Sequence, residues 1–281
     1  MPNKTVNVGK QNELNILKCI DGKKVGSLPA HFQKGILQMY KVVSKNDVVK
    51  ATKYSDWDGN KPDIKIELTN HDKYLNISIK TGWTPSLHQE NFYSFLNFLR
   101  TLEISNETIN TLIFYHHADD TYDGTGVDKL RFDQFREKYK ERIAKASEEL
   151  SQEHIVKAVA YRAIIAGREE KRMKVNYLYH GTEVEGFFVH REDILNKIST
   201  VGREKYTALH FGPMVYVAKI PNKCDQYGNK YQYAQLIWPK MDEDLKKIYD
   251  SSYHPSLEFK QETTLDRIKR WWKNFSKKYL E

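Results

Sequence analysis

The chain has 281 residues and is 40% hydrophobic and 12% aromatic, which is the composition of a folded globular protein and excludes a largely disordered one. Its formal net charge is +8, and this balance favours a polyanionic partner because Lys and Arg side chains set against phosphates release condensed counterions. The chain start lacks a signal-peptide core, no window approaches ~20 continuous apolar residues, and Cys19 and Cys224 lie outside CxxC pairs. We expect a cytoplasmic protein with no membrane segment, zinc ribbon or disulfide framework.

The first predicted elements are two helices and a strand. Residues 8–22 place Leu14, Leu17 and Ile20 on a helical period, with Gly22 as a stop signal. Residues 31–45 predict a second helix, residues 47–55 predict a strand, and the Asp, Gly and Pro content of residues 56–62 predicts a turn.

The stretch KPDIKIELTNHDKYLNISIKTG, residues 61–82, predicts a β-hairpin. In its first half Asp63 alternates with apolar residues, and in its second half Lys80 does the same. With residues 70–73 as the loop, Leu68 lies opposite Leu75, and Asp63 lies opposite Lys80. Directly opposed residues have Cβ atoms ~5 Å apart, so the acid and the lysine should meet on the polar face.

Residues 86–102 predict a helix that Ser86 caps, with an apolar stripe, and residues 108–117 predict a fourth strand. The order over residues 10–117 is therefore helix, three strands, helix, strand. The remainder predicts two helices between residues 131 and 167, followed by short strands and helices in alternation. These are a hairpin (174–181 and 185–191), a helix (191–198), two strands (208–221 and 231–238) and a final helix (262–280).

Pro62 and Asp63, followed after fourteen residues by Ser78, Ile79 and Lys80, resemble the motif of the PD-(D/E)xK nuclease superfamily, the restriction-endonuclease-like phosphodiesterases. The core order of that family is also helix, three strands, helix, strand. The resemblance implies an α/β fold with a mixed central sheet flanked by helices and an α+β C-terminal region. It places a nuclease-like core at 1–120 and a helical and α+β region, expected to bind DNA, at 121–281.

The resemblance implies a metal-dependent DNA endonuclease of the restriction or phage type, which hydrolyses phosphodiesters. Carboxylates suit Mg²⁺, a hard cation that prefers oxygen ligands, and Mn²⁺ is expected to substitute. Asp63 would be a metal ligand and Lys80 would hold or polarise the attacking water. In the family a glutamate on the first helix often approaches the metal, and Glu13 stands where that residue is expected.

Ser78 stands where the family usually has an acid, and a hydroxyl is a weaker magnesium ligand than a carboxylate. Some family members move the missing acid to the following helix, where Glu90 is predicted on the first turn. Glu67 shares a face with Asp63 but lies ~13 Å along the strand, which is too far for the same ion. The catalytic set is therefore Asp63, Lys80, Glu13, Ser78 and Glu90, with Asp63, Glu13 and Glu90 as metal ligands.

The C-terminal segment DRIKRWWKNFSKKYLE surrounds an apolar helix face with cations that suit phosphate contact. Its predicted DNA-binding residues are Arg267, Lys269, Arg270, Lys273 and Lys277. Double-stranded DNA is the expected partner. A homodimer is compatible with cutting both strands, although no heptad or apolar stripe indicates an interface.

Other interpretations of these patterns stay open at this point. An Asp facing a Lys is also an ordinary cross-strand ion pair, Glu90 also suits a helix N-terminus, and a basic helix face is often only solvated. The chain could be a nucleic-acid-binding protein that kept the nuclease fold and lost turnover, which Ser78 favours, or a basic protein with an unrelated activity.

Overall fold

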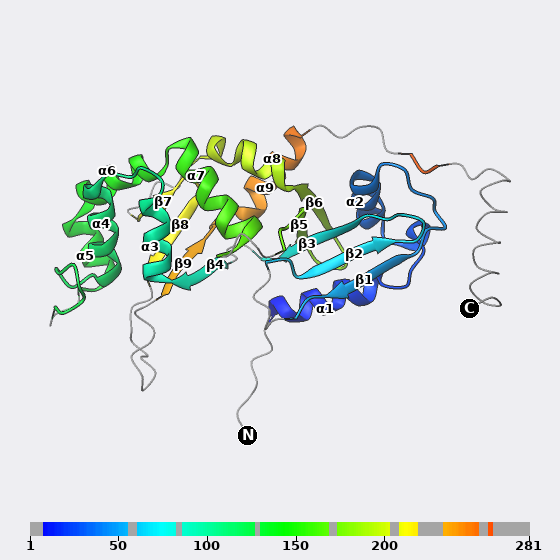
Figure 1. Cartoon of the computed structure of the whole chain (residues 1–281), viewed down its shortest axis with the longest axis horizontal. Coiled ribbons are helices and arrows are strands. Elements are labelled where there is room, and N and C mark those ends of the chain that lie inside the picture. The colour runs from blue at the N-terminus through cyan, green and yellow to red at the C-terminus, as the bar shows by residue number, and fades with distance from the viewer. Residues whose placement is uncertain are drawn as a thin grey trace, which may run out of the picture.

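The computed structural model describes residues 8–55, 61–82, 86–126, 130–168, 173–202, 208–218, 233–252 and 258–260. Within these residues the chain is a mixed α/β protein built around two sheets, which lie one after the other along the long axis of the molecule (Figure 1). The first sheet has the order β1-β2-β3-β5-β6 and the second has the order β4-β9-β8-β7. The strands of the first sheet are β1 (Val49–Lys53), β2 (Ile64–Leu68), β3 (Tyr74–Lys80), β5 (Tyr177–Gly181) and β6 (Gly186–His190). Those of the second sheet are β4 (Ser86–Asn91), β7 (His210–Phe211), β8 (Met214–Ala218) and β9 (Tyr233–Ile237).

The first sheet is mixed, because β3 pairs antiparallel with β2 and parallel with β5. The hairpin expected in residues 61–82 is present, but its predicted register is wrong by two residues. Ile66 lies opposite Leu75, and Ile64 lies opposite Ile77. The last pair is Glu67 with Tyr74, so the connection spans residues 68–73 and is two residues longer than the predicted loop of residues 70–73, and Asn70 adopts a positive φ of 68° within it. A two-residue slip keeps every side chain on its predicted face, and it brings Asp63 beside Ser78.

The two helices predicted in residues 8–22 and 31–45 are present as α1 (Val8–Ile20) and α2 (Ala30–Tyr40), and both cover one face of this sheet. Their apolar side chains pack on alternate residues of the strands, including Ile64, Ile66 and Ile77, which are at most 1% exposed. The predicted stripe of α1 is wrong in part: Leu14 is exposed, and Ile16 is buried together with Ile20.

The segment from residue 86 to residue 117 differs from its prediction. Residues 86–91 form strand β4, because they pair with β9 in the second sheet, and the helix α3 (Phe92–Arg100) begins only after them. The cap is therefore Asn91, whose side chain accepts hydrogen bonds from the Tyr93 and Ser94 amides, and not Ser86. Residues 108–117 are helical and belong to α4 (Asn106–His117), which Ser105 caps, so the predicted fourth strand is wrong.

The order helix, three strands, helix, strand is found over a longer stretch of chain once residues 86–150, which add β4 and further helices between β3 and α7, are set aside. The helix α7 (Glu153–Ala160), continued by the π-helical turn η2 (Tyr161–Ala166), supplies the second helix. β5 then supplies the strand that lies parallel to β3. Each sheet draws strands from both sides of residue 120.

The remaining elements complete the second core. They are the helices α5 (Phe132–Lys138), α6 (Lys140–Leu150), α8 (Arg191–Lys197) and α9 (Met241–Ser251), with the 3-10 turn η3 (Ile198–Thr200). A further 3-10 turn, η1 (Val25–Ser27), belongs to the first core. The predicted hairpin of residues 174–191 is present as β5 and β6, and the strand predicted over residues 231–238 is present as β9. The single strand predicted over residues 208–221 is wrong in part, because the chain turns within it and forms the antiparallel pair β7 and β8, and α9 was not predicted. Among the described residues, no helix combines the length and the apolar character that crossing a bilayer requires.

Candidate functional site

Asp63, Ser78 and Lys80 meet on one face of the first sheet. The Asp63 Oδ2 atom accepts a hydrogen bond from the Ser78 hydroxyl at 3.1 Å and another from the Ile79 amide at 2.5 Å. Lys80 Nζ lies 3.9 Å from the same oxygen and donates to the Ile79 carbonyl at 3.2 Å. These three contacts all use Oδ2, and Oδ1 of Asp63 makes no hydrogen bond to a described residue.

This arrangement follows from the alternation of the two strands. Ile64, Ile77 and Ile79 point into the core under α1 and α2, so their neighbours point to the opposite face. Ser78 is only 1% exposed, whereas the side chains of Asp63 and Lys80 are 22% and 19% exposed. The carboxylate is therefore held by a buried hydroxyl and a backbone amide, while it and the ammonium group stay accessible from outside.

Lys61 brings a second cation to this face. Its Nζ donates a hydrogen bond of 2.6 Å to the carbonyl of Leu87 in β4, which ties the start of β2 to the second sheet. Burial, together with the positive charge of Lys80, lowers the pKa of Lys61 to about 7, against the opposing effect of Asp63 and Glu90. No sequence pattern predicts a functional role for Lys61, because a lysine two residues before an acid belongs to no recognisable motif.

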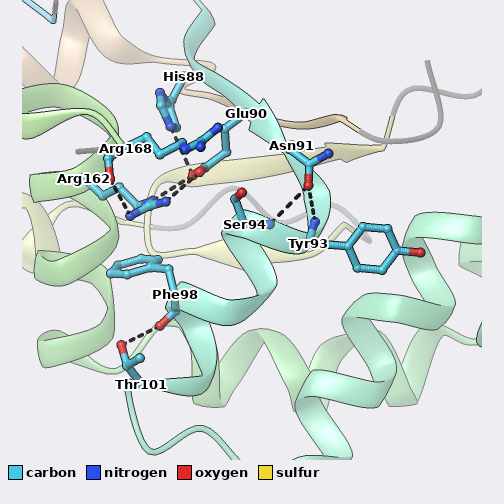
Figure 2. A network of polar contacts seen from close by, with 9 residues as sticks. All are labelled: His88, Glu90, Asn91, Tyr93, Ser94, Phe98, Thr101, Arg162 and Arg168. Carbon is cyan, nitrogen blue, oxygen red and sulfur yellow. Dashed lines mark hydrogen bonds and ion pairs between the residues drawn. The ribbon is translucent and has the colours of Figure 1, made fainter. Parts of the chain in front are cut away.

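Glu90 lies in strand β4 and not on the first turn of a helix, where it was predicted. The Arg162 guanidinium holds its carboxylate by two hydrogen bonds of 2.8 and 2.6 Å, and His88 Nε2 lies 3.1 Å from it (Figure 2). The guanidinium also stacks over the Phe98 ring at 4.5 Å. Burial would raise the pKa of Glu90, but the Arg162 and His88 hydrogen bonds outweigh it and lower that pKa to about 2.

This network is well enclosed, since the side chains of Glu90, Arg162 and His88 are 3%, 14% and 12% exposed. Burial lowers the pKa of His88, although its hydrogen bond to Glu90 opposes this. Arg162 comes from the π-helical turn η2, a distortion that often marks functional sites in helices. Seventy-two residues separate it from Glu90, so no local sequence pattern could have indicated this pair.

Glu13 lies on α1, where its carboxylate forms an ion pair of 3.0 Å with Lys53. Lys53 follows Val49 and Ala51 along the core-facing side of β1. The register therefore places this pair on the side of the sheet that α1 covers, and Asp63 on the other side.

The predicted metal ligands are not gathered into one preformed site. Within the described ranges, no group of three or more His, Cys, Asp or Glu side chains is placed to hold a metal ion. Asp63 and Ser78 lie together, whereas Glu13 and Glu90 have cations of their own as partners. The predicted DNA-binding residues of the C-terminal segment lie outside the described residues.

The comparison with solved structures finds the crystal structure of restriction endonuclease MspI in complex with its cognate DNA. The two chains are 14% identical, and the match covers 82% of this chain and 88% of that chain with a TM-score of 0.46. No protein-family profile matches the chain, and no curated protein matches it.

Proposed function

We propose that the protein is a metal-dependent DNA endonuclease that hydrolyses phosphodiesters at Asp63, Ser78 and Lys80. The observation that carries this proposal is that the Ser78 hydroxyl and the Lys80 ammonium group both lie beside one oxygen atom of the Asp63 carboxylate, Oδ2. Hydrolysis of a phosphodiester anion needs charge neutralisation and an activated water, and an accessible acid and lysine side by side can provide both. The net charge of +8 is consistent with a polyanionic substrate.

The donor chemistry fits Mg²⁺ or Mn²⁺, because the available ligands are hard oxygen atoms. Asp63 would hold the ion through Oδ1, which the neighbouring residues leave available, with Ser78 beside it. Magnesium sites often use only one or two carboxylates and complete the coordination with water and substrate phosphate. A bound ion would supply Lewis-acid stabilisation of the phosphoryl oxygens and a water of lowered pKa.

The protein's own residues would orient the reactants. Ser78 and the Ile79 amide fix the Asp63 carboxylate by donating to Oδ2. Lys80 would donate a hydrogen bond to the attacking water or to a phosphoryl oxygen, and its positive charge would offset the charge that develops there. Lys61 lies close enough to Asp63 and Lys80 for their charges to change its pKa, and it would add positive potential at the same phosphate.

Glu13 and Glu90 are further proposed ligands of the metal ion, but each already has a cation as its partner. Each would have to exchange a cation for the metal: Lys53 in the case of Glu13, and Arg162 in the case of Glu90. Glu13 would also have to reach the ion from the opposite side of the sheet to Asp63. The free protein should therefore bind Mg²⁺ weakly, and DNA phosphate should strengthen that binding. The basic C-terminal segment would contact the DNA backbone in this proposal.

A second candidate is a DNA-binding protein that kept this fold without turnover. Ser78 at the position of the usual acid favours it, as does the engagement of Glu90 with Arg162. Both features reduce the negative charge that is available to a metal ion.

Cleavage of supercoiled plasmid by the full-length chain separates the two candidates. We expect nicking that requires Mg²⁺ and stops with EDTA, and we expect Lys80→Ala to lower its rate by about 10² or more. Lys50→Ala is the matched control, because Lys50 is a lysine of β1 whose side chain is 74% exposed, and it should cleave normally. DNA binding without cleavage at any Mg²⁺ or Mn²⁺ concentration would support the second candidate instead.

A further inference from the structure

A cavity of about 530 Å³ lies just beyond Lys80, at the end of the first sheet. Its wall comes from α2, the residues after β3, the β5–β6 turn and α9. The side chains that matter for its chemistry are His31, His180, Glu185, Phe187, Asp242 and Lys246. This volume is within the range of about 300 to 1,000 Å³ that small-molecule sites occupy.

The cavity adjoins the candidate site through His180. In the parallel pairing of β3 with β5, His180 is in register with Lys80. Because Tyr177 and Tyr179 face the same core as Ile77 and Ile79, His180 and Lys80 both point to the other face. Neighbouring strands lie about 4.8 Å apart, so a group held at Lys80 has the cavity directly beside it.

Two imidazoles of the cavity have unused hydrogen-bonding capacity. His180 is 9% exposed, and the Nε2 atoms of His180 and His31 are buried without a hydrogen-bond partner in the structure. Burial lowers the pKa of both side chains, against the hydrogen bond to the Gly82 backbone and the charge of Asp242 at His180, and against the charge of Glu185 at His31. A neutral imidazole offers one donor and one acceptor, so a polar ligand can pair with the free Nε2 atom of each ring.

The charges of the cavity select against an anion. Glu185 and Asp242 carry negative charge, and the one lysine of the lining, Lys246, is already paired with Asp250. A free phosphate would meet net repulsion here. A metal ion is not indicated either, since the described residues contain no suitable group of three ligands. A neutral ligand with N–H donors matches the carboxylates and imidazoles, and the Phe187 ring offers it an apolar surface.

We propose that this cavity binds an unstacked nucleobase of a nucleotide next to the phosphate that is held at Asp63 and Lys80. Amino groups of the base donate to Asp242, Glu185 or the free Nε2 atom of His180, whose other ring nitrogen is engaged with the Gly82 backbone, and a ring nitrogen or carbonyl oxygen of the base pairs with His31. Enzymes that bind bases outside the stack recognise them by such edge hydrogen bonds and by contact with aromatic rings. This inference rests on the proposed function, since the neighbouring phosphate belongs to the substrate of that site.

The test measures nucleoside binding, not cleavage, so it can fail independently of the proposed function. The ¹⁵N-labelled full chain is titrated with deoxyadenosine, deoxyguanosine, deoxycytidine or thymidine, and the imidazole nitrogen resonances are followed by NMR. Inorganic phosphate and deoxyribose 5-phosphate serve as the comparison ligands. We expect saturable shifts at His31 and His180 with at least one of the nucleosides that carry an amino group, and no such shifts with either phosphate.

Two variants define the contact. Asp242→Asn should weaken the binding of that nucleoside about tenfold, because a charged hydrogen-bond partner is lost. Glu192→Gln is the control outside the cavity, at an exposed residue paired with Arg191, and it should bind as the wild type does. The absence of saturable histidine shifts with every nucleoside would overturn the inference, as would equal shifts with inorganic phosphate. The plasmid assay reports separately on whether the chain cleaves DNA.

Discussion

Replacing Arg162 by methionine tests the buried ion pair between Arg162 and Glu90. The variant leaves the Glu90 carboxylate 3% exposed and without its guanidinium partner. The lowering of the Glu90 pKa from 4.5 to about 2 corresponds to about 3 kcal/mol, since each tenfold change in proton affinity is worth about 1.4 kcal/mol. Breaking a buried ion pair by removing one partner costs about 3–5 kcal/mol. We therefore expect Arg162→Met to lower the free energy of unfolding at pH 7 by about 3 kcal/mol.

The pH dependence gives this loss a specific signature. Because the folded-state pKa of Glu90 lies below its unfolded value, the stabilisation is complete above about pH 4.5 and disappears as the pH falls through about 2. The difference between wild type and Arg162→Met should therefore be largest near neutral pH and shrink as the pH falls from about 5 to about 2.

Urea denaturation followed by circular dichroism, at several pH values, measures both effects. Lys145→Met is the matched control, since it breaks an exposed ion pair with Glu107 and should change stability far less. The double variant Arg162→Met, Glu90→Gln should recover much of the loss, because no uncompensated charge stays buried. A loss below about 1 kcal/mol at pH 7, or a loss that does not vary with pH, would refute the reasoning.

Two further predictions concern packing and protonation. Gly35→Ala in α2 should lower the free energy of unfolding by about 1–3 kcal/mol, because the new Cβ would lie 2.1 Å from the ring of Phe188, which is itself 2% exposed. In the same denaturation assay Gly202→Ala, whose new Cβ has no atom within 4 Å among the described residues other than its chain neighbours, should behave almost as the wild type, and equal losses would contradict the packing argument. The unfolded chain keeps Lys61 protonated up to about pH 10.5 and the folded protein releases that proton above about pH 7, so this residue should make stability rise with pH between these values. Lys61→Met should remove that part of the rise and the exposed Lys140→Met should not; identical pH profiles for the two variants would disprove the assignment.

The alternation of residues 61–82 was sufficient to predict the hairpin and the faces of Asp63 and Lys80. It was not sufficient for the register, because a period of two is unchanged by a slip of two residues. Only the length of the connection decides between the two pairings, and that length depends on the local conformation at Asn70. The pairing of Asp63 with Ser78 therefore could not be predicted from the sequence alone.

The errors at residues 86–117 have a different cause. Residues 86–91 are a strand only because β9, about 145 positions away, pairs with them. Residues 108–117 contain β-branched and aromatic residues that favour strands, yet they form α4. This helix is buried on several sides, and Thr108, Leu112 and Tyr115 are all at most 4% exposed, so it lacks the single apolar stripe by which a helix is recognised.

The parallel pairing of β3 with β5 has a consequence for how the chain acquires its structure. The meander β1-β2-β3 consists of contacts close in sequence and can form early, whereas the pairing of Ile77 with Tyr177 joins residues one hundred positions apart and must follow a costly loop closure. Until that step, β3 is an edge strand with open backbone donors and acceptors, which invites pairing with other chains. During synthesis, β3 can pair with β5 only after residue 181 has emerged. Aggregation before the first sheet is complete is therefore the characteristic hazard of this fold.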